Sequence, residues 1–396
     1  MKQNTTSIIM ALDKKYDVIV VGGGPSGLQT ARFLSEEGLE VLVLEKRQDI
    51  GETVVCTGII GNNVFDEFQI SRNSVISEIQ NVSMISPYQT ALTYSHTEPF
   101  ASVVDRAILD KEIADLAGQS GTHIECGALV DDIKIAEDHV VVKTINEKDG
   151  KNVTTYRAKV VVLATGVNTT LHRMVGLRAP QNFFNGVQTE VPKNGSNNTT
   201  IYIGNRIAPG AFAWAVPAGE QVRIGLVTEG NPRESFDKYM SRYYSEDWEN
   251  GARDKTKYKM IVQGALSKTY GHRVLAVGEA AGQVKTTTGG GVYFGLLGSR
   301  IASTTILQNL RNNDLTSKAF SEYDKSWKKA IHKEILVGFY ARKIFSRLND
   351  GQIERLFLLA QNNGVFPYIR ENGNFDWHSD LILGLAKKSP LFQSLT

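Results

Sequence analysis

The sequence is poor in cysteine, with only two among 396 residues, and this excludes several classes of protein. Cys56 and Cys126 are too few for a disulfide framework, and they lack the paired spacing of a zinc or iron–sulfur site. The seven histidines are scattered, without the HExxH spacing of a zinc enzyme. We therefore expect no metal site, and we expect a reducing, cytoplasmic compartment.

Long apolar runs and an excess of one charge are missing as well. The apolar stretch near the N-terminus, residues 7–12, is much shorter than the roughly 20 residues that a membrane helix needs. Lys and Arg number 44 and nearly balance 42 Asp and Glu, which argues against a broad positive field for nucleic acid. The sequence therefore predicts no nucleic-acid partner, and a protein that is soluble or rests on a membrane surface.

A β-branched run over residues 16–21 predicts a buried strand. A glycine-rich turn follows it and leads into a predicted helix. The turn has the GxGxxG spacing: Gly22 permits the tight turn, Gly24 lets a pyrophosphate approach the backbone, and Gly27 lets helix and strand pack closely. The helix N-terminus adds free amides and partial positive charge. The predicted site comprises Gly22, Gly24, Pro25, Ser26 and Gly27.

An acidic residue stands at the end of the next buried strand, residues 40–44. Glu45 lies 18 positions past Gly27, where a carboxylate accepts hydrogen bonds from an adenosine ribose and repels a 2′-phosphate. Lys46 follows directly and belongs to the same predicted site. This combination favours a dinucleotide site over a glycine turn that binds nothing.

A second glycine-lined cradle follows far along the chain and indicates which dinucleotide is bound. Gly278 and Glu279 come after a buried strand at 273–277, and Gly289, Gly290 and Gly291 open a long helix. An extended FAD needs its ribityl chain held and its ring met by a helix N-terminus, which stabilises the charge of the reduced flavin. A nicotinamide cofactor has no need of a second cradle, so we predict FAD. The alternative is that residues 286–291 form a mobile loop.

Together these elements resemble the FAD-binding elements of the p-hydroxybenzoate hydroxylase-like flavoprotein superfamily. The resemblance includes an Asp105-Arg106 pair that opens a helix and a strand that ends at Ala164 to Gly166. It implies that Arg106 contacts the cofactor near its pyrophosphate and ribityl chain, and that Ala164 and Gly166 also line the site. It further implies that Glu279, where the superfamily has Asp, binds the ribityl hydroxyls.

A strand-like stretch at 209–219 suggests the substrate. Alternation places three apolar side chains on one face of a second sheet, as a wall suited to a hydrophobic molecule. The stretch resembles the Tyr-x-Trp-x-Phe-Pro-x-Gly motif of the geranylgeranyl reductase family, and less fully the Trp-x-Trp-x-Ile-Pro motif of flavin halogenases. An ordinary sheet core is the alternative. The predicted substrate-binding residues are Phe212, Trp214, Val216, Pro217 and Gly219.

Cys56 lies at the centre of a loop, residues 51–61, where superfamily members place a segment near the flavin. Archaeal geranylgeranyl reductases resemble this sequence in having a cysteine followed closely by glycine, here Gly58. The resemblance implies that the thiol faces the substrate or the flavin and helps to deliver a proton. The alternative is a small buried apolar residue, which is the role we assign to Cys126.

The predicted fold class is α/β: a Rossmann-like FAD/NAD(P)-binding domain, an antiparallel β-sheet substrate domain and a helical C-terminal cap. The FAD-binding domain is discontinuous and comprises residues 1–75, 101–180 and 265–322. The substrate domain comprises residues 76–100 and 181–264, and residues 323–396 form the C-terminal region.

In the C-terminal region, residues 325–347 are predicted to form a basic amphipathic helix that could lie on an anionic membrane. The alternative is a helix with a solvated basic face whose apolar face packs against the core. Residues 375–392 also resemble the closing segment of geranylgeranyl reductases.

The resemblance implies an FAD-dependent oxidoreductase that reduces isoprenoid C=C bonds of a geranylgeranyl lipid or diphosphate. Flavin N5 would give a hydride, and Cys56 or a water would give a proton. One alternative is a flavin monooxygenase or a halogenase, which uses a lysine between cofactor and substrate that the sequence does not place. A second alternative is a redox-neutral isoprenoid cyclase. No second GxGxxG unit follows the first, so the external electron donor, NAD(P)H or a protein such as ferredoxin, stays open.

Overall fold

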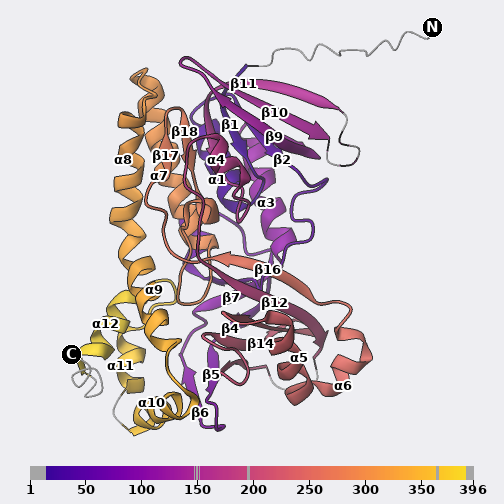
Figure 1. Ribbon diagram of the computed structural model, residues 1–396, viewed down its shortest axis with the longest axis vertical. Helices are drawn as coiled ribbons and strands as arrows, with labels where there is room; N and C mark the ends of the chain where they lie inside the picture. The colour runs from indigo at the N-terminus through magenta and orange to yellow at the C-terminus, as the bar shows by residue number, and fades with distance from the viewer. Residues whose placement is uncertain are drawn as a thin grey trace.

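A mainly parallel sheet of eight strands occupies the upper half of the molecule (Figure 1). The computed structural model describes residues 15–388 except 147, 149, 151, 194–196, 363 and 364, so the stretches 7–12 and 389–392 lie outside the described residues. The strand order is β17-β18-β11-β1-β2-β8, and β10 joins β11 to β9. The strands are β1 (Lys15–Val21), β2 (Val41–Glu45), β8 (His123–Cys126), β9 (Ala128–Ile135), β10 (Val140–Asn146), β11 (Val153–Leu163), β17 (Tyr270–Gly271) and β18 (Val274–Ala276).

Both faces of this sheet are covered, which explains its continuous apolar strands. Val18 and Val20 of β1 pack into one core cluster with the helices, whereas Ile19 and Val21 pack into another with β9, β10 and α4. The helices are α1 (Pro25–Glu36), α3 (Arg106–Gln119), α4 (Thr170–Met174), α7 (Val292–Arg311) and α8 (Ser317–Trp327). Alternate side chains of β1 thus point to opposite faces of the sheet and contribute to two separate cores.

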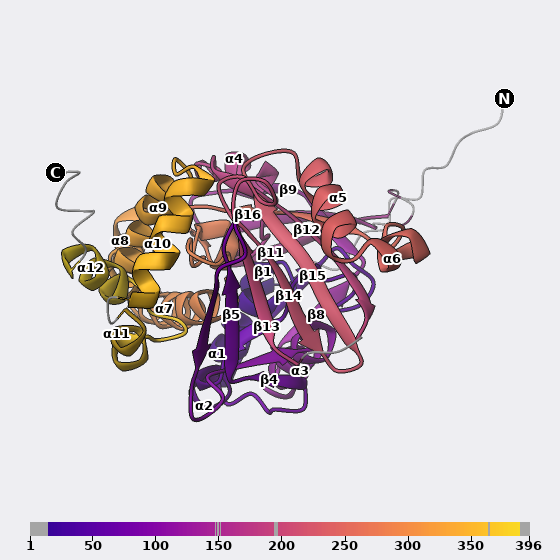
Figure 2. The same cartoon turned by 90° about the horizontal axis from the view of Figure 1, so that it is seen from below.

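A second sheet of seven strands forms the lower half, and several of its strands lie side by side in the view from below (Figure 2). Its order is β16-β12-β15-β14-β13-β5-β6, antiparallel except for the parallel pair of β13 and β5. Ala213 and Ala215 face α5 (Pro232–Tyr243), whose Phe236 and Tyr239 complete that core. The strands are β5 (Asn81–Ile85), β6 (Ala91–Ser95), β12 (Phe183–Pro192), β13 (Thr199–Ile203), β14 (Phe212–Ala218), β15 (Gln221–Thr228) and β16 (Lys257–Val262). Between α5 and β16 the chain forms α6 (Ser245–Asp247) and a π-helical turn (Trp248–Ala252).

A small third sheet, in the order β3-β7-β4, links the two halves. It comprises β3 (Ile59–Gly61), β7 (Ala101–Val104) and β4 (Val75–Ile79), with α2 (Asn63–Phe68) after β3. Of the strands in the predicted substrate-domain segment 76–100, β5 and β6 lie in the second sheet, whereas β4 lies in the third. Ile79 of β4 instead packs with Val103 against Val216, so this strand fills the junction between the sheets.

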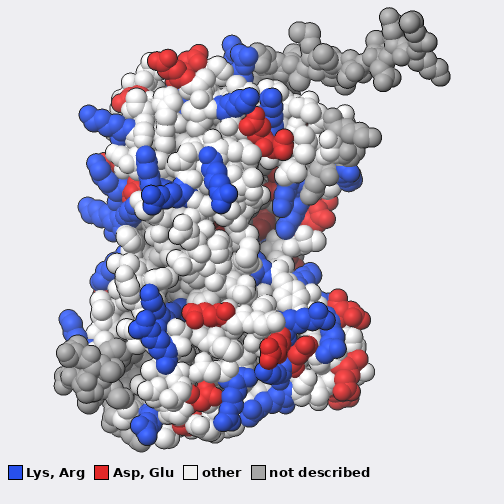
Figure 3. Space-filling view, viewed as in Figure 1, with Lys and Arg blue, Asp and Glu red and all other residues white. Residues whose placement is uncertain are grey.

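Helices after residue 316 descend along one side of both halves (Figure 1). They continue from α8 through a π-helical turn (Lys328–His332) to α9 (Lys333–Phe345), α10 (Asp350–Asn362), α11 (Val365–Asn372) and α12 (Ser379–Lys388). Among the described residues, none of the helices combines the length and the apolar character needed to cross a bilayer. Basic and acidic side chains both occur on the upper and lower halves of the face drawn in Figure 3.

Candidate active site

A cavity of about 480 Å³ opens where β1, β2 and β11 end. The residues that line it are distributed along the chain from position 21 to position 376. The carboxyl edge of a parallel sheet is where such folds bind ligands. Gly27 and Gly278, although predicted, lie behind the wall, as their contacts below show. The predicted residues that line the cavity are Gly22, Gly24, Pro25, Ser26, Glu45, Lys46, Cys56, Arg106, Ala164, Gly166, Glu279, Gly289, Gly290 and Gly291.

The first glycine turn has the geometry of a pyrophosphate cradle. Gly22 has φ +113°, and a Cβ there would lie 2.4 Å from Ala164 O, while a Cβ on Gly27 would lie 2.0 Å from Gly22 O. A Cβ on Gly24 would meet nothing within 4 Å, so that side of the turn is open. No side chain caps the N-terminus of α1, and its amides are therefore available to an anion.

Glu45 is held beside this turn by two backbone amides. Its Oε2 accepts a hydrogen bond from Gly23 N–H at 2.7 Å, and its Oε1 accepts one from Arg47 N–H at 3.0 Å. Each carboxylate oxygen keeps a further lone pair. The geometry thus fits the predicted acceptor for ribose hydroxyls.

The second cradle packs directly against the first. Gly278 has φ +63°, and a Cβ there would lie 2.4 Å from Ser26 Oγ. Glu279 Oε1 accepts from Val262 N–H at 3.3 Å, and its Oε2 lies 3.5 Å from Lys259 Nζ. The Glu279 side chain therefore spans from the first sheet to β16 of the second.

The glycine triplet is closed by its own backbone. Lys285 N–H donates to Gly290 O and Gly289 N–H donates to Lys285 O, both at 2.8 Å. Gly291 is the N-cap of α7, and no side chain caps that helix. A second uncapped helix N-terminus thus faces the cavity, and both cradles fit an extended FAD.

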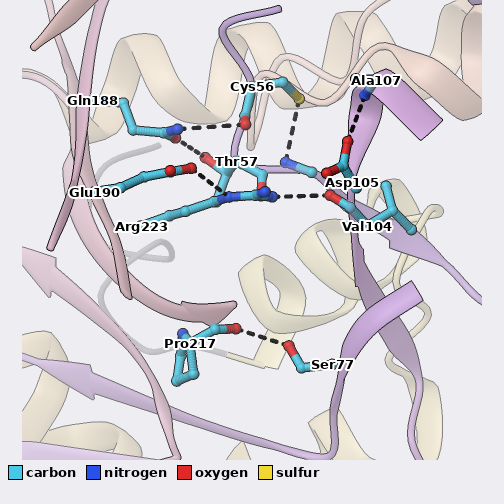
Figure 4. Close-up of polar contacts among 11 residues, drawn as sticks. Cys56, Thr57, Ser77, Val104, Asp105, Ala107, Gln188, Glu190, Pro217 and Arg223 are labelled. Atoms are coloured by element: carbon cyan, nitrogen blue, oxygen red, sulfur yellow. Dashed lines mark hydrogen bonds and ion pairs between the residues drawn. The ribbon is translucent and has the colours of Figure 1, made fainter. Parts of the chain in front are cut away.

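The loop that carries Cys56 is tied to the second sheet, as Figure 4 shows. Gln188 of β12 donates from Nε2 to Cys56 O at 3.4 Å and accepts from Thr57 Oγ1 at 3.0 Å. Arg223 of β15 donates from Nη1 to Thr57 O at 2.8 Å. The Gly58 amide donates to Cys56 Sγ at 3.4 Å, so the sulfur has a defined position in the cavity wall.

Charges around Cys56 alter its acidity. Burial raises the pKa of the thiol, but Arg106, Lys259 and the Gly58 amide outweigh burial, so the pKa lies below its ordinary value. Arg106 is itself fixed by Asp110, with Nε to Oδ1 at 2.9 Å and Nη2 to Oδ2 at 3.0 Å. A thiol held beside these cations is a candidate for proton transfer to a bound substrate.

The predicted substrate wall is only partly present. The rings of Phe212 and Trp214 lie 6.0 Å apart and are half-buried, but Val216 is fully buried against the third sheet, so it cannot face a ligand. Pro217 points to the opposite face by strand alternation, and Gly219, with φ +66°, turns the chain toward β15. None of these five described residues lines the cavity.

Several cavity residues were not found from the sequence. Lys285, Phe375 and Asp376 line the wall together with Lys259 and Tyr293. Lys285 had one available signal, since it is the only charged residue between Glu279 and the glycine triplet. Asp376 lies 91 residues further on, and no motif connects the two.

Comparisons with known proteins agree with this geometry. The family model described as pyridine nucleotide-disulphide oxidoreductase matches residues 16–196. Digeranylgeranylglycerophospholipid reductase of Methanocaldococcus jannaschii is 29% identical over 87% of this chain and 90% of its own length. The reductase 1 of the same name from Methanococcoides burtonii is 27% identical, over 87% of each chain.

Solved structures show the same fold. A geranylgeranyl bacteriochlorophyll reductase-like protein from Thermoplasma acidophilum superposes with a TM-score of 0.82 at 21% identity, covering 96% of this chain and 98% of its own. A flavin-dependent brominase superposes with a TM-score of 0.71 at 18% identity, over 97% and 100% of the two chains. Along most of its length the chain is thus similar to proteins named as geranylgeranyl reductases.

The matched oxidoreductase domain and the reductase relatives identify the protein as an FAD-dependent oxidoreductase. The two glycine cradles, with Glu45 and Glu279, are the elements of the chain that fit this cofactor. The expected α/β class and Rossmann-like architecture are confirmed.

Proposed function

We propose that this flavoprotein saturates C=C bonds of an isoprenoid lipid of the geranylgeranyl type. Bound FAD would supply the hydride. The names of relatives that match 87% of the chain support this substrate class. The observation that carries the proposal is the position of Cys56, a thiol of lowered pKa in the wall of the cavity that both cradles also line.

The roles of the chain's own residues follow from this chemistry. Saturation adds one hydride and one proton to each double bond, and an isolated alkene does not provide the proton. Cys56 would donate it to the second alkene carbon and recover one from solvent. Arg106, fixed by Asp110, would stabilise the thiolate that remains. We assign the FAD to the cavity-lining residues named above, supported from behind by Gly27 and Gly278.

The apolar part of the substrate needs a path that begins at this cavity. We propose that Phe212 and Trp214 form part of that path, because their rings are adjacent and half-buried. The Arg342 guanidinium lies 5.7 Å from the centre of the Phe212 ring and would border the path. Val216, Pro217 and Gly219 would support it only by shaping β14.

The test is anaerobic turnover of the chemically reduced enzyme with a geranylgeranyl glycerolipid, followed by mass spectrometry. Products should gain two hydrogens per saturated bond, and Cys56→Ser should slow saturation by about 100-fold or more, the usual contribution of a general acid. Cys126→Ser is the matched control and should retain the wild-type rate. Absence of saturated product would remove the proposal. Mixing the oxidised enzyme with NAD(P)H or with reduced ferredoxin identifies the donor.

Two rival activities have distinct outcomes in the same experiment. A monooxygenase or halogenase would consume oxygen and yield a hydroxylated or halogenated aromatic product. Although Lys285 lies in the cavity wall, its Nζ is bonded to Asp376 and to Phe375 O, which does not favour the free lysine of a halogenase. A redox-neutral cyclase would give a product of unchanged mass and altered connectivity.

We also propose peripheral contact with an anionic membrane through α9. Leu336, Tyr340 and Ile344 form an exposed stripe at four-residue spacing, with exposed fractions of 44%, 55% and 46%. Lys343 lies on the same helix and is exposed, as expected of an interfacial helix. Lys333 is exposed as well, but its Nζ pairs with Asp380 at 2.6 Å.

Other residues of the predicted amphipathic segment do not belong to this surface. Trp327, Ile331 and Ile335 are core residues, Lys328 pairs with Asp324, and Arg342 donates to the Gly210 and Thr287 carbonyls inside the protein. Sedimentation with vesicles containing anionic lipid should capture the wild type and lose the variant Leu336→Ser/Tyr340→Ser/Ile344→Ser. Equal sedimentation of both proteins would contradict the proposal.

A further inference from the structure

Lys285 is a buried cation in the wall of the cofactor cavity. Its side chain is 7% exposed, and its Nζ lies 2.6 Å from Oδ1 of Asp376, whose side chain is 2% exposed. The same Nζ donates to Phe375 O at 3.1 Å and lies 4.3 Å from the centre of the Phe375 ring. The ammonium group therefore has a fixed position at the cavity surface.

Lys285 is also part of the second cradle. Its backbone closes the loop around Gly289 and Gly290. A Cβ built on Gly290 would lie 3.1 Å from Lys285 Cε, so the side chain folds back over the glycine triplet. The cation and the uncapped N-terminus of α7 thus contribute positive potential to the same part of the cavity.

Asp376, the carboxylate partner of Lys285, lies in the segment that follows α11, and hydrogen bonds hold this segment in place. His378 Nε2–H donates to Phe375 O at 2.9 Å, since a carbonyl oxygen can only accept. In the neutral ring the other nitrogen, Nδ1, then accepts from the Thr287 hydroxyl at 2.7 Å. Glu334 of α9 accepts the His378 amide at 2.8 Å. The C-terminal region thus holds Asp376 against the loop that carries Lys285.

We propose that Lys285 raises the reduction potential of the bound flavin and that Asp376 moderates this effect. Full reduction at neutral pH adds two electrons and one proton to the flavin, and the resulting negative charge is stabilised by a nearby buried cation. The neighbouring carboxylate opposes this stabilisation. The inference rests on the FAD site of the proposed function and does not depend on the identity of the substrate.

The test is equilibrium reduction of the FAD-loaded protein against a reference dye at fixed pH. At the wild-type midpoint, Lys285→Met should lower the ratio of reduced to oxidised flavin about tenfold, which is about 30 mV for a two-electron couple. Asp376→Asn should raise the ratio by a similar factor. Opposite shifts are expected only from charges that act on the flavin, because a purely structural clamp would give shifts of the same sign or none.

Lys328→Met is the matched control. Lys328 Nζ also lies 2.6 Å from a carboxylate oxygen, that of Asp324, but both residues are outside the cavity wall, so the potential should not change. Unchanged potentials in Lys285→Met and Asp376→Asn would overturn the inference. If Lys285→Met does not retain FAD, Asp376→Asn decides alone: a raised potential supports the inference, and an unchanged or lowered one overturns it. A wild-type protein without flavin absorbance would instead remove the proposed function.

Discussion

Arg223 of β15 donates from one nitrogen, Nη1, to two carbonyls, Thr57 O at 2.8 Å and Val104 O at 2.9 Å. Gly58 is required at this crossing, because a Cβ there would lie 2.6 Å from the same nitrogen and 2.4 Å from Val104 O. The second sheet therefore fixes the loop that carries Cys56, although that loop follows a strand of the first sheet.

Arg223→Met should destabilise the protein by removing this link. Two carbonyls would lose a charged donor, and unsatisfied buried groups cost about 1–3 kcal/mol each. Urea denaturation should show a lower midpoint. Glu190→Gln provides the control: Glu190 pairs with Arg223 Nε at 3.0 Å but is 44% exposed, so its loss should cost less than about 1 kcal/mol. Equal losses from both substitutions would show that the carbonyl bonds contribute little.

Gly225→Ala should disturb the wall predicted for the substrate. Trp214 pairs with Gly225 across β14 and β15, and a Cβ on Gly225 would lie 2.4 Å from the indole ring and 2.7 Å from Val187 O. Overpacking of this kind costs about 1–3 kcal/mol, and the tryptophan emission should shift as the ring moves. Gly230→Ala is the control, since its Cβ would come no closer than 3.4 Å to another atom. An unchanged spectrum and stability in Gly225→Ala would refute the described packing.

The two cysteines should differ in the pH dependence of alkylation. The pKa of Cys56 is lowered despite burial, because of Arg106, whereas burial and the Glu45 carboxylate raise the pKa of Cys126. Since the thiolate is the reactive form, Cys56 should reach half its maximal rate at a lower pH than Cys126. Peptide mass spectrometry of iodoacetamide-treated protein measures both rates in one sample. Arg106→Met should shift the Cys56 profile to higher pH, and an unshifted profile would contradict the assigned cause.

His172 should contribute to acid destabilisation. Burial lowers the pKa of this fully buried side chain, although it bonds to Ala280 O at 2.8 Å. Below about pH 6.5 the unfolded chain binds a proton that the folded His172 does not, so the free energy of unfolding falls as the pH drops. His172→Gln should lose less stability between pH 7.5 and 5.5, as measured by urea denaturation at each pH. Equal slopes for the wild type and His172→Gln would exclude this role.

The first cradle could be predicted because its residues are close in sequence and each has one physical task. The tight φ of Gly22 and the close contact of Gly27 both have direct sequence signals, and so does Glu45 at the end of β2. Glu279 and the glycine triplet repeat that order, so the second cradle was found as well. The proposed domain boundaries stay a prediction.

The rest of the site depends on tertiary contacts that leave no local pattern. Alternation placed Val216 correctly on the face of Phe212 and Trp214, but it did not show that β4 and β7 would cover that end of the strand. The pairing of Lys285 with Asp376 joins two residues without any shared motif. In both cases the partner comes from a distant segment, and periodicity describes only one side of the contact.

The wall of the cavity includes Gly22 near one end of the described chain and Asp376 near the other. A ribosome adds about 5–20 residues per second and releases the N-terminal strands first. The turn after β1 therefore emerges long before the segment that completes the cavity. The complete cavity wall can therefore form only after nearly all of the polypeptide has been synthesised, and we expect prematurely terminated chains to accumulate without colour.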